Sequence, residues 1–165
     1  SRYRLVGLPG EHVTPPGRPG LPEAIEAREL VELAVARLAA GRRSEADLRR
    51  MRVALAGMCE WTCDPARFAQ YDEALHASLC AAARNDVLAG TLAALGDRIR
   101  EMIALFVRLA AARGELGELA EAHARLVDAV ERRDAEAAAG MIAEMMARLR
   151  DAADVPPGPV AAAHR

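Results

Sequence analysis

The chain has 165 residues, a formal charge of -2 at pH 7 and 52% hydrophobic residues. This length suits one domain with a substantial core, and the charge lacks the basic excess of a nucleic-acid-binding surface. All 22 basic residues are Arg, which excludes P-loop, Schiff-base and general-base lysines.

The apolar runs and the cysteines of the chain indicate its cellular compartment. No apolar run reaches the length of a membrane span, and the chain does not start with an export-signal pattern. Three cysteines are an odd number that suits a reducing compartment, so we expect a cytoplasmic protein with no membrane partner. Because free Cys is among the most buried residue types, we expect Cys59 and Cys63 to fill the core.

Prolines and glycines crowd both ends of the chain. Their density predicts a linker or arm over residues 1–21 and a flexible tail over residues 153–165. Between them, residues 22–152 are dominated by Ala, Leu, Arg and Glu, and β-branched residues are sparse. This composition predicts helices throughout the central region.

The first two expected helices have recognisable ends. The first runs over about 22–40 and stops at Gly41. The second follows Ser44, whose hydroxyl can cap the helix, with Asp47 three residues further on.

The next two helices have polar caps as well. Asp64 is a natural N-cap of the third helix, and Pro65 takes the first helical position, where a missing N–H costs nothing. The fourth helix begins after Asn85 and is expected to continue to about Arg113, where Gly114 ends it.

The last two helices complete an all-α fold. We expect the fifth helix from about Glu115 and the sixth after the Asp134 cap. Short connections predict antiparallel neighbours, and no repeat indicates a solenoid. The fold class is therefore an all-α antiparallel bundle of six to seven helices.

Three polar residues lie within apolar helical stripes. Asp72 projects within about 40° of the centre of its stripe, and His76 follows one turn later, so both reach one point beside the helix. His123 lies inside the stripe of the fifth helix, whereas Glu144 is about 60° off the edge of its stripe.

A carboxylate and two imidazoles are ligands that hold Zn²⁺, Ni²⁺ or Mn²⁺ in a bundle core. Two simpler interpretations remain open. Asp72 can hydrogen-bond His76 on the same helix, and His123 can be a core histidine whose ring is satisfied. Arg98, Arg100 and Arg108 are interpreted as solvated or ion-paired surface.

Several short motifs occur in a definite order between residues 22 and 152. They are Arg28-x3-Glu32 with Leu38-Ala39-Ala40, Asp72-x3-His76 with Asn85 nine residues later, Glu121-Ala-His123, and Asp134-x3-Ala138. This ordered set resembles the FCD domain, the C-terminal domain of the FadR subfamily of GntR-family transcription regulators.

The resemblance implies a homodimeric helical bundle that senses a small metabolite, commonly a carboxylic acid. Operator DNA would be bound only by an N-terminal winged helix-turn-helix, which we expect to precede Ser1 in the natural protein. The resemblance also implies a metal held by one Asp and three His. Matched by position, the ligands are Asp72, His76 and His123, but Met145 stands where the third His is expected.

A thioether is a poor ligand for Zn²⁺, Ni²⁺ or Mn²⁺, which leaves three alternatives. Asp72, His76 and His123 can hold a metal weakly, with water or an effector carboxylate completing the shell. In a metal-free pocket, Arg28 and the histidines meet an anionic effector directly. The third alternative, that Glu144 swings in, requires a rotation that its stripe does not support. Candidate effector-binding residues are Arg28, Asp72, His76, His123 and Met145.

The functional prediction is an effector-sensing and dimerisation domain, not an enzyme. One rival is a metal-dependent helical-bundle enzyme that uses Asp72, His76 and His123 as ligands and an activated water. Against it, Glu121 and His123 lack the spacing of the Glu-x-x-His pairs in such bundles. A second rival is a purely structural helical oligomerisation module.

Overall fold

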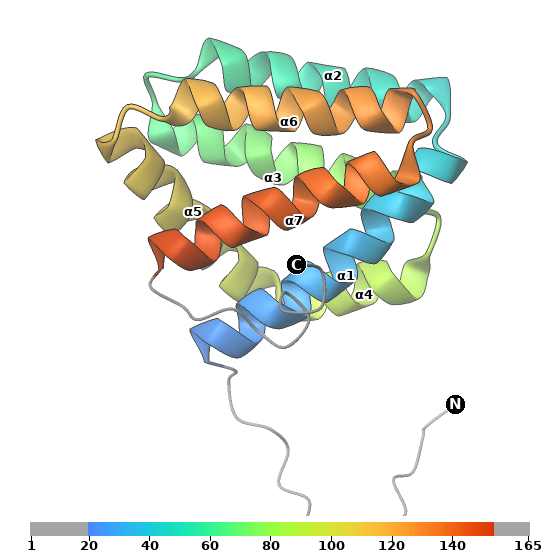
Figure 1. The fold of residues 1–165 in the computed structure, drawn as a ribbon, viewed down its shortest axis with the longest axis horizontal. Helices are drawn as coiled ribbons and strands as arrows, with labels where there is room; N and C mark the ends of the chain where they lie inside the picture. The colour runs from blue at the N-terminus through green and yellow to red at the C-terminus, as the bar shows by residue number, and fades with distance from the viewer. Residues whose placement is uncertain (1–19, 154–165) are drawn as a thin grey trace, which may run out of the picture.

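A computed structural model describes residues 20–153 of the chain, and this region is entirely helical apart from short turns. Figure 1 shows the arrangement. The seven helices are α1 (Leu21–Arg42), α2 (Glu45–Glu60), α3 (Pro65–Ala82), α4 (Asp86–Ala94), α5 (Gly96–Ala112), α6 (Leu116–Glu131) and α7 (Ala135–Ala152). The all-α bundle predicted from the sequence is confirmed.

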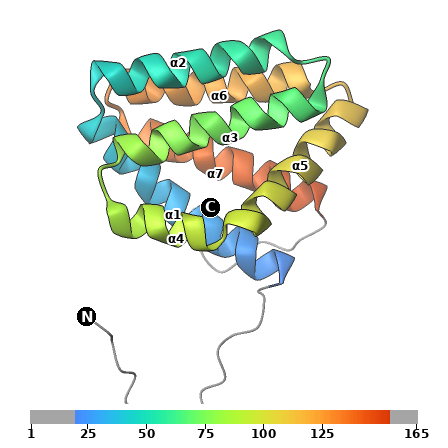
Figure 2. The same cartoon turned by 180° about the vertical axis from the view of Figure 1, so that it is seen from behind.

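The helices surround one apolar core. α1 packs most extensively on α7, and α2 on α3, while α6 contacts both α2 and α7. Figure 2 shows α3 in front, flanked by α5, with α4 crossing α1 below them. Phe68 and Leu75 of α3, Leu126 of α6 and Ile142 of α7 are completely or almost completely buried. The core therefore lies where α1, α3, α6 and α7 meet.

Side-chain caps begin four of the helices where the sequence predicts them. Ser44 and Asp47 form a reciprocal capping box at the start of α2. Asp64 accepts hydrogen bonds from two backbone N–H groups of α3, Asn85 does the same for α4, and Asp134 accepts one from α7. These contacts satisfy N–H groups that have no partner within the helix.

The prediction of a single helix between Asn85 and Arg113 is wrong, because this segment is divided at Leu95 into α4 and α5. The Leu95 N–H donates to the carbonyl of Leu92, a tight 3₁₀-type bond, and Gly96, a weak helix former, follows. The break lets α4 pack on α1 while α5 packs mainly on α3. Tertiary contacts therefore decide this boundary.

Two smaller expectations also need correction. α1 continues to Arg42, so Gly41 lies inside the helix instead of ending it. Cys59 and Cys63 are exposed. α2 turns Met51, Ala54 and Met58 toward the core and so leaves Cys59 outside, while Cys63 lies in the turn after α2. The prediction that these two cysteines fill the core is therefore wrong.

The expected arm and tail lie almost entirely outside the described residues. The first described helix, α1, begins at Leu21 and the last, α7, ends at Ala152. None of the helices within residues 20–153 has the length and apolarity needed to cross a membrane.

Candidate metal and effector site

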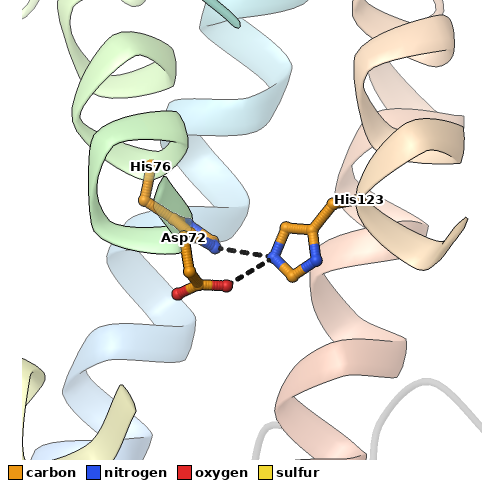
Figure 3. A group of neighbouring side chains, drawn as sticks. All are labelled: Asp72, His76 and His123. Atoms are coloured by element: carbon orange, nitrogen blue, oxygen red, sulfur yellow. Dashed lines mark hydrogen bonds and ion pairs between the residues drawn. The ribbon is translucent and has the colours of Figure 1, made fainter. Parts of the chain in front are cut away.

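The structure brings the three predicted ligand residues together. Asp72 and His76 extend from α3 toward His123 on α6, as Figure 3 shows. His123 Nε2 lies 2.9 Å from Asp72 Oδ1 and 3.4 Å from His76 Nε2. One ligand atom from each residue lies within 4.8 Å of the other two. Asp72 therefore pairs with His123 on another helix. The alternative in which Asp72 hydrogen-bonds His76 on its own helix is not what the structure shows.

The orientation of His123 is set by its own helix. Its Nδ1 lies 2.8 Å from the carbonyl oxygen of Leu119. Since a carbonyl oxygen only accepts, Nδ1 carries the proton and the neutral ring keeps a lone pair on Nε2. That lone pair faces Asp72 and His76.

Glu32 is a site residue that the sequence analysis did not name as a candidate. It is 3% exposed, and its Oε1 accepts a hydrogen bond of 2.7 Å from Nε of Arg28. Its Oε2 lies 2.9 Å from His76 Nδ1, although the alignment is too poor for either atom to form a good hydrogen bond. The i, i+4 spacing of Arg28 and Glu32 was the available signal, because it places both on one helical face.

Glu32 lies behind the His76 ring as the Leu119 carbonyl lies behind the His123 ring. A carboxylate beside Nδ1 favours the proton on that nitrogen and leaves Nε2 free. Burial alone would lower the pKa of His76, but the negative charges of Glu32 and Asp72 outweigh it and raise the pKa. Burial likewise opposes ionisation of Glu32, yet Arg28 and His76 hold its pKa far below the ordinary range.

Three lone pairs therefore converge on one point: those of Asp72 Oδ1, His76 Nε2 and His123 Nε2. Two imidazole lone pairs 3.4 Å apart repel each other unless a cation lies between them. The cation can be a proton or a metal ion. The donor set, with a supporting group behind each imidazole, fits an open three-ligand metal site.

The formal charges support the same conclusion. Arg28 contributes one positive charge, Glu32 and Asp72 contribute one negative charge each, and all three are buried. With neutral histidines the cluster therefore carries a net charge of -1. Because an uncompensated buried charge is costly, the cluster requires one further positive charge.

A small cavity adjoins the converging atoms. The centre of a water-sized sphere can occupy about 20 Å³ of it, which is room for an ion or one water molecule. α5 and α7 supply an apolar wall, which consists of Ile103, Phe106, Ile142, Met145, Met146 and Leu149. Met145 thus faces the same cavity as the three ligands, whereas Glu144 is exposed on α7. The alternative in which Glu144 completes a metal shell finds no support here.

The other sequence candidates lie on the surface. Arg98 pairs with Glu101, Arg100 pairs with Asp97, and Arg108 is exposed. Their interpretation as solvated or ion-paired arginines agrees with these contacts. Arg28 is different, because it is buried against Glu32.

Comparison with known families gives one clear match. A sequence model of the FCD domain matches residues 23–148, which is most of the chain and includes all seven helices in whole or in large part. A search of curated proteins finds no match.

Proposed function

The chain belongs to the FCD domain family, a regulatory domain found in GntR-family regulators, and on that premise we propose that it senses a small carboxylate through a bound divalent metal. Asp72, His76 and His123 would hold the metal, and the effector carboxylate would take an open coordination position. The observation that carries this proposal is the convergence of three donors in a buried cluster, where His123 Nε2 lies 2.9 Å from Asp72 Oδ1 and 3.4 Å from His76 Nε2.

The charge balance explains why metal and effector belong together. A divalent ion changes the net charge of the cluster from -1 to +1, and a monocarboxylate returns it to zero. Each therefore strengthens the binding of the other, since the coupling between two ligands is reciprocal. The bound metal would supply Lewis acidity that fixes the carboxylate, and the protein supplies its position and the exclusion of water.

Effector binding requires the apolar wall to move. The inner cavity admits an ion but not a metabolite. Phe106 of α5 also lines an outer cavity, open to solvent, between α5, α6 and α7, where the centre of a water-sized sphere can occupy about 220 Å³. We infer that the effector enters from this side and displaces Phe106, so that α5 shifts relative to α7. Such a shift is a two-state element that effector binding can bias.

The transmission step follows from the family. We propose a homodimer in which residues 22–152 form the sensing and dimerisation unit. Operator DNA would be contacted only by a winged helix-turn-helix outside this chain. The shift of α5 and α7 would favour one dimer arrangement and so change operator affinity.

The cavity favours sensing over catalysis. Apart from the three ligands, its titratable lining residues among those described are Arg28 and Glu32, which are bonded to each other. A hydrolytic metal site needs a further base or acid to move a proton. With both groups engaged, the lining offers no side chain for that role.

The test is thermal unfolding with Zn²⁺ and acetate, separately and together. Binding at 100 times the dissociation constant stabilises by about 2.7 kcal/mol, which raises the melting temperature by roughly 5–10 °C in a chain of this size. His123→Ala removes a ligand and should abolish the increase, whereas Glu144→Gln, on the exposed face of α7, should retain it. Equal Zn²⁺ responses in wild type and His123→Ala would contradict the site.

A further inference from the structure

The apolar wall of the cavity contains two sulfur donors. Met145 and Met146 on α7 are 6% and 3% exposed, and both line the cavity beside the three ligands. The other wall residues from α5 and α7 are Ile103, Phe106, Ile142 and Leu149. These side chains have no lone pair to offer. Among these wall residues, therefore, only Met145 and Met146 could offer a lone pair to a cation bound by the histidines.

Thioether sulfur selects among metals. It is a soft donor that suits Cu(I), whereas Mn²⁺ prefers oxygen and Zn²⁺ binds nitrogen, oxygen or thiolate. Imidazole nitrogen suits copper as well, so His76 and His123 do not oppose this preference. Two imidazoles and one thioether are a sufficient set for Cu(I), which accepts low coordination numbers.

The charge of the cluster favours a monovalent ion. Arg28, Glu32 and Asp72 sum to -1 when the histidines are neutral, and all three are buried. One Cu(I) brings the cluster to zero without any added anion. A divalent ion leaves one positive charge that only a bound anion can remove. Cu(I) thus neutralises the charge of the cluster without a second ligand.

The size and surroundings of the cavity agree with this ion. The space of about 20 Å³ accepts one ion and little water. The apolar wall limits the access of water, which would otherwise favour the more strongly hydrated Cu(II) after oxidation by dissolved dioxygen. His76 and His123 already present Nε2, so copper requires no change of tautomer.

From these contacts we infer that the cavity is a Cu(I) site, in which His76 Nε2, His123 Nε2 and a thioether of the Met145–Met146 pair are the ligands and Asp72 supplies the counter-charge. The inference rests on the proposed function, since it concerns the same ligands. It adds that copper occupies the position of the divalent metal without an effector. Copper would then be a second input to the same regulator.

The experiment must exclude the thiols, because Cys59 and Cys63 are exposed and Cys80 is partly buried. The background protein is therefore the full chain with Cys59→Ser, Cys63→Ser and Cys80→Ala. Under anaerobic conditions it competes with a chromophoric chelator for Cu(I), and copper X-ray absorption reports the neighbouring atoms. We expect one Cu(I) per chain with a sulfur neighbour in the cysteine-free protein.

The decisive variant is Met145→Leu with Met146→Leu, which keeps the apolar volume and removes both sulfurs. We expect its Cu(I) affinity to fall roughly tenfold or more, on the scale of losing a supporting group of a metal site. Met141→Leu is the matched control, because Met141 lies on the same helix, is partly buried and does not line the cavity.

The inference is overturned if the cysteine-free protein binds no Cu(I), or if the double Leu variant binds it as tightly as its background. Binding of Zn²⁺ with acetate in that double variant separates the two proposals. Retained Zn²⁺ binding with unaltered copper affinity refutes the copper site alone. Loss of every metal response in the background protein refutes the proposed function too.

Discussion

The two halves of the cavity differ in the contacts that their side chains make behind the cavity. On the side formed by α1, α3 and α6, each histidine has a second partner, Leu119 for His123 and Glu32 for His76. On the side formed by α5 and α7, Phe106 and Met145 contribute only apolar atoms and a thioether. The first half is arranged for cation binding. The second half decides which ion or effector fits.

Among the substitutions that test this comparison, loss of Glu32 should have the largest effect, because it removes the carboxylate behind His76. We expect Glu32→Gln to weaken Zn²⁺ binding by about 10–100-fold, since a neutral amide no longer fixes the charge behind His76. The metal-free protein should also lose about 3 kcal/mol, because Arg28 is left buried without its ion-pair partner. Calorimetric titration and urea unfolding measure the two effects.

Glu144→Gln is the matched control for that change. Glu144 is exposed, so the substitution should alter stability by less than about 0.5 kcal/mol and leave Zn²⁺ affinity unchanged. If Glu32→Gln loses stability but keeps full metal affinity, Glu32 serves the fold and does not position His76.

A second substitution adds a nitrogen donor to the apolar half of the cavity. Met145→His places an imidazole on the wall that faces the three ligands. We expect Zn²⁺ affinity to increase about tenfold or more, because a fourth nitrogen donor completes the preferred tetrahedral shell. Met141→His, one turn earlier and away from the cavity, should leave it unchanged. A wild-type affinity in Met145→His would show that position 145 cannot reach the metal.

The sequence predicts the helix starts and part of the site for the same physical reason, which is that these features are local. Ser44, Asp64, Asn85 and Asp134 act on backbone groups within three residues, so no tertiary knowledge is needed. The convergence of Asp72 and His76 likewise follows from i, i+4 spacing.

Features that depend on contacts between helices were missed. The break at Leu95 follows from the packing of α4 on α1 and α5 on α3. The approach of Glu32 to His76 joins two helices 44 positions apart in the sequence, and no local pattern predicts it. The exposure of Cys59 depends on which face of α2 meets α3 and α6, although its residue type favours burial.

The smallest expected effect is a pH dependence that arises in the polar half alone. The pKa of His76 in the metal-free fold is raised above its ordinary value of 6.5, because Glu32 and Asp72 outweigh burial. Protonated His76 therefore stabilises the fold fully below about pH 6.5, and this contribution disappears as pH rises through the higher folded-state value. Zn²⁺ must displace that proton, so its affinity should increase over the same range.

At the acid end the sign is opposite. The pKa of Asp72 is lowered from 3.8 despite its burial, mainly by the charge and hydrogen bond of His123, and that of Glu32 is lowered from 4.5. Their stabilisation is present above those ordinary values and is lost as pH falls through the lower folded-state values. Urea unfolding without metal should therefore show greatest stability between about pH 5 and pH 6.5. His76→Gln should remove the decline on the alkaline side and reduce the one on the acid side, because His76 also helps to lower the pKa of both carboxylates. An unchanged decline in His76→Gln would assign the titration to a group outside the cavity.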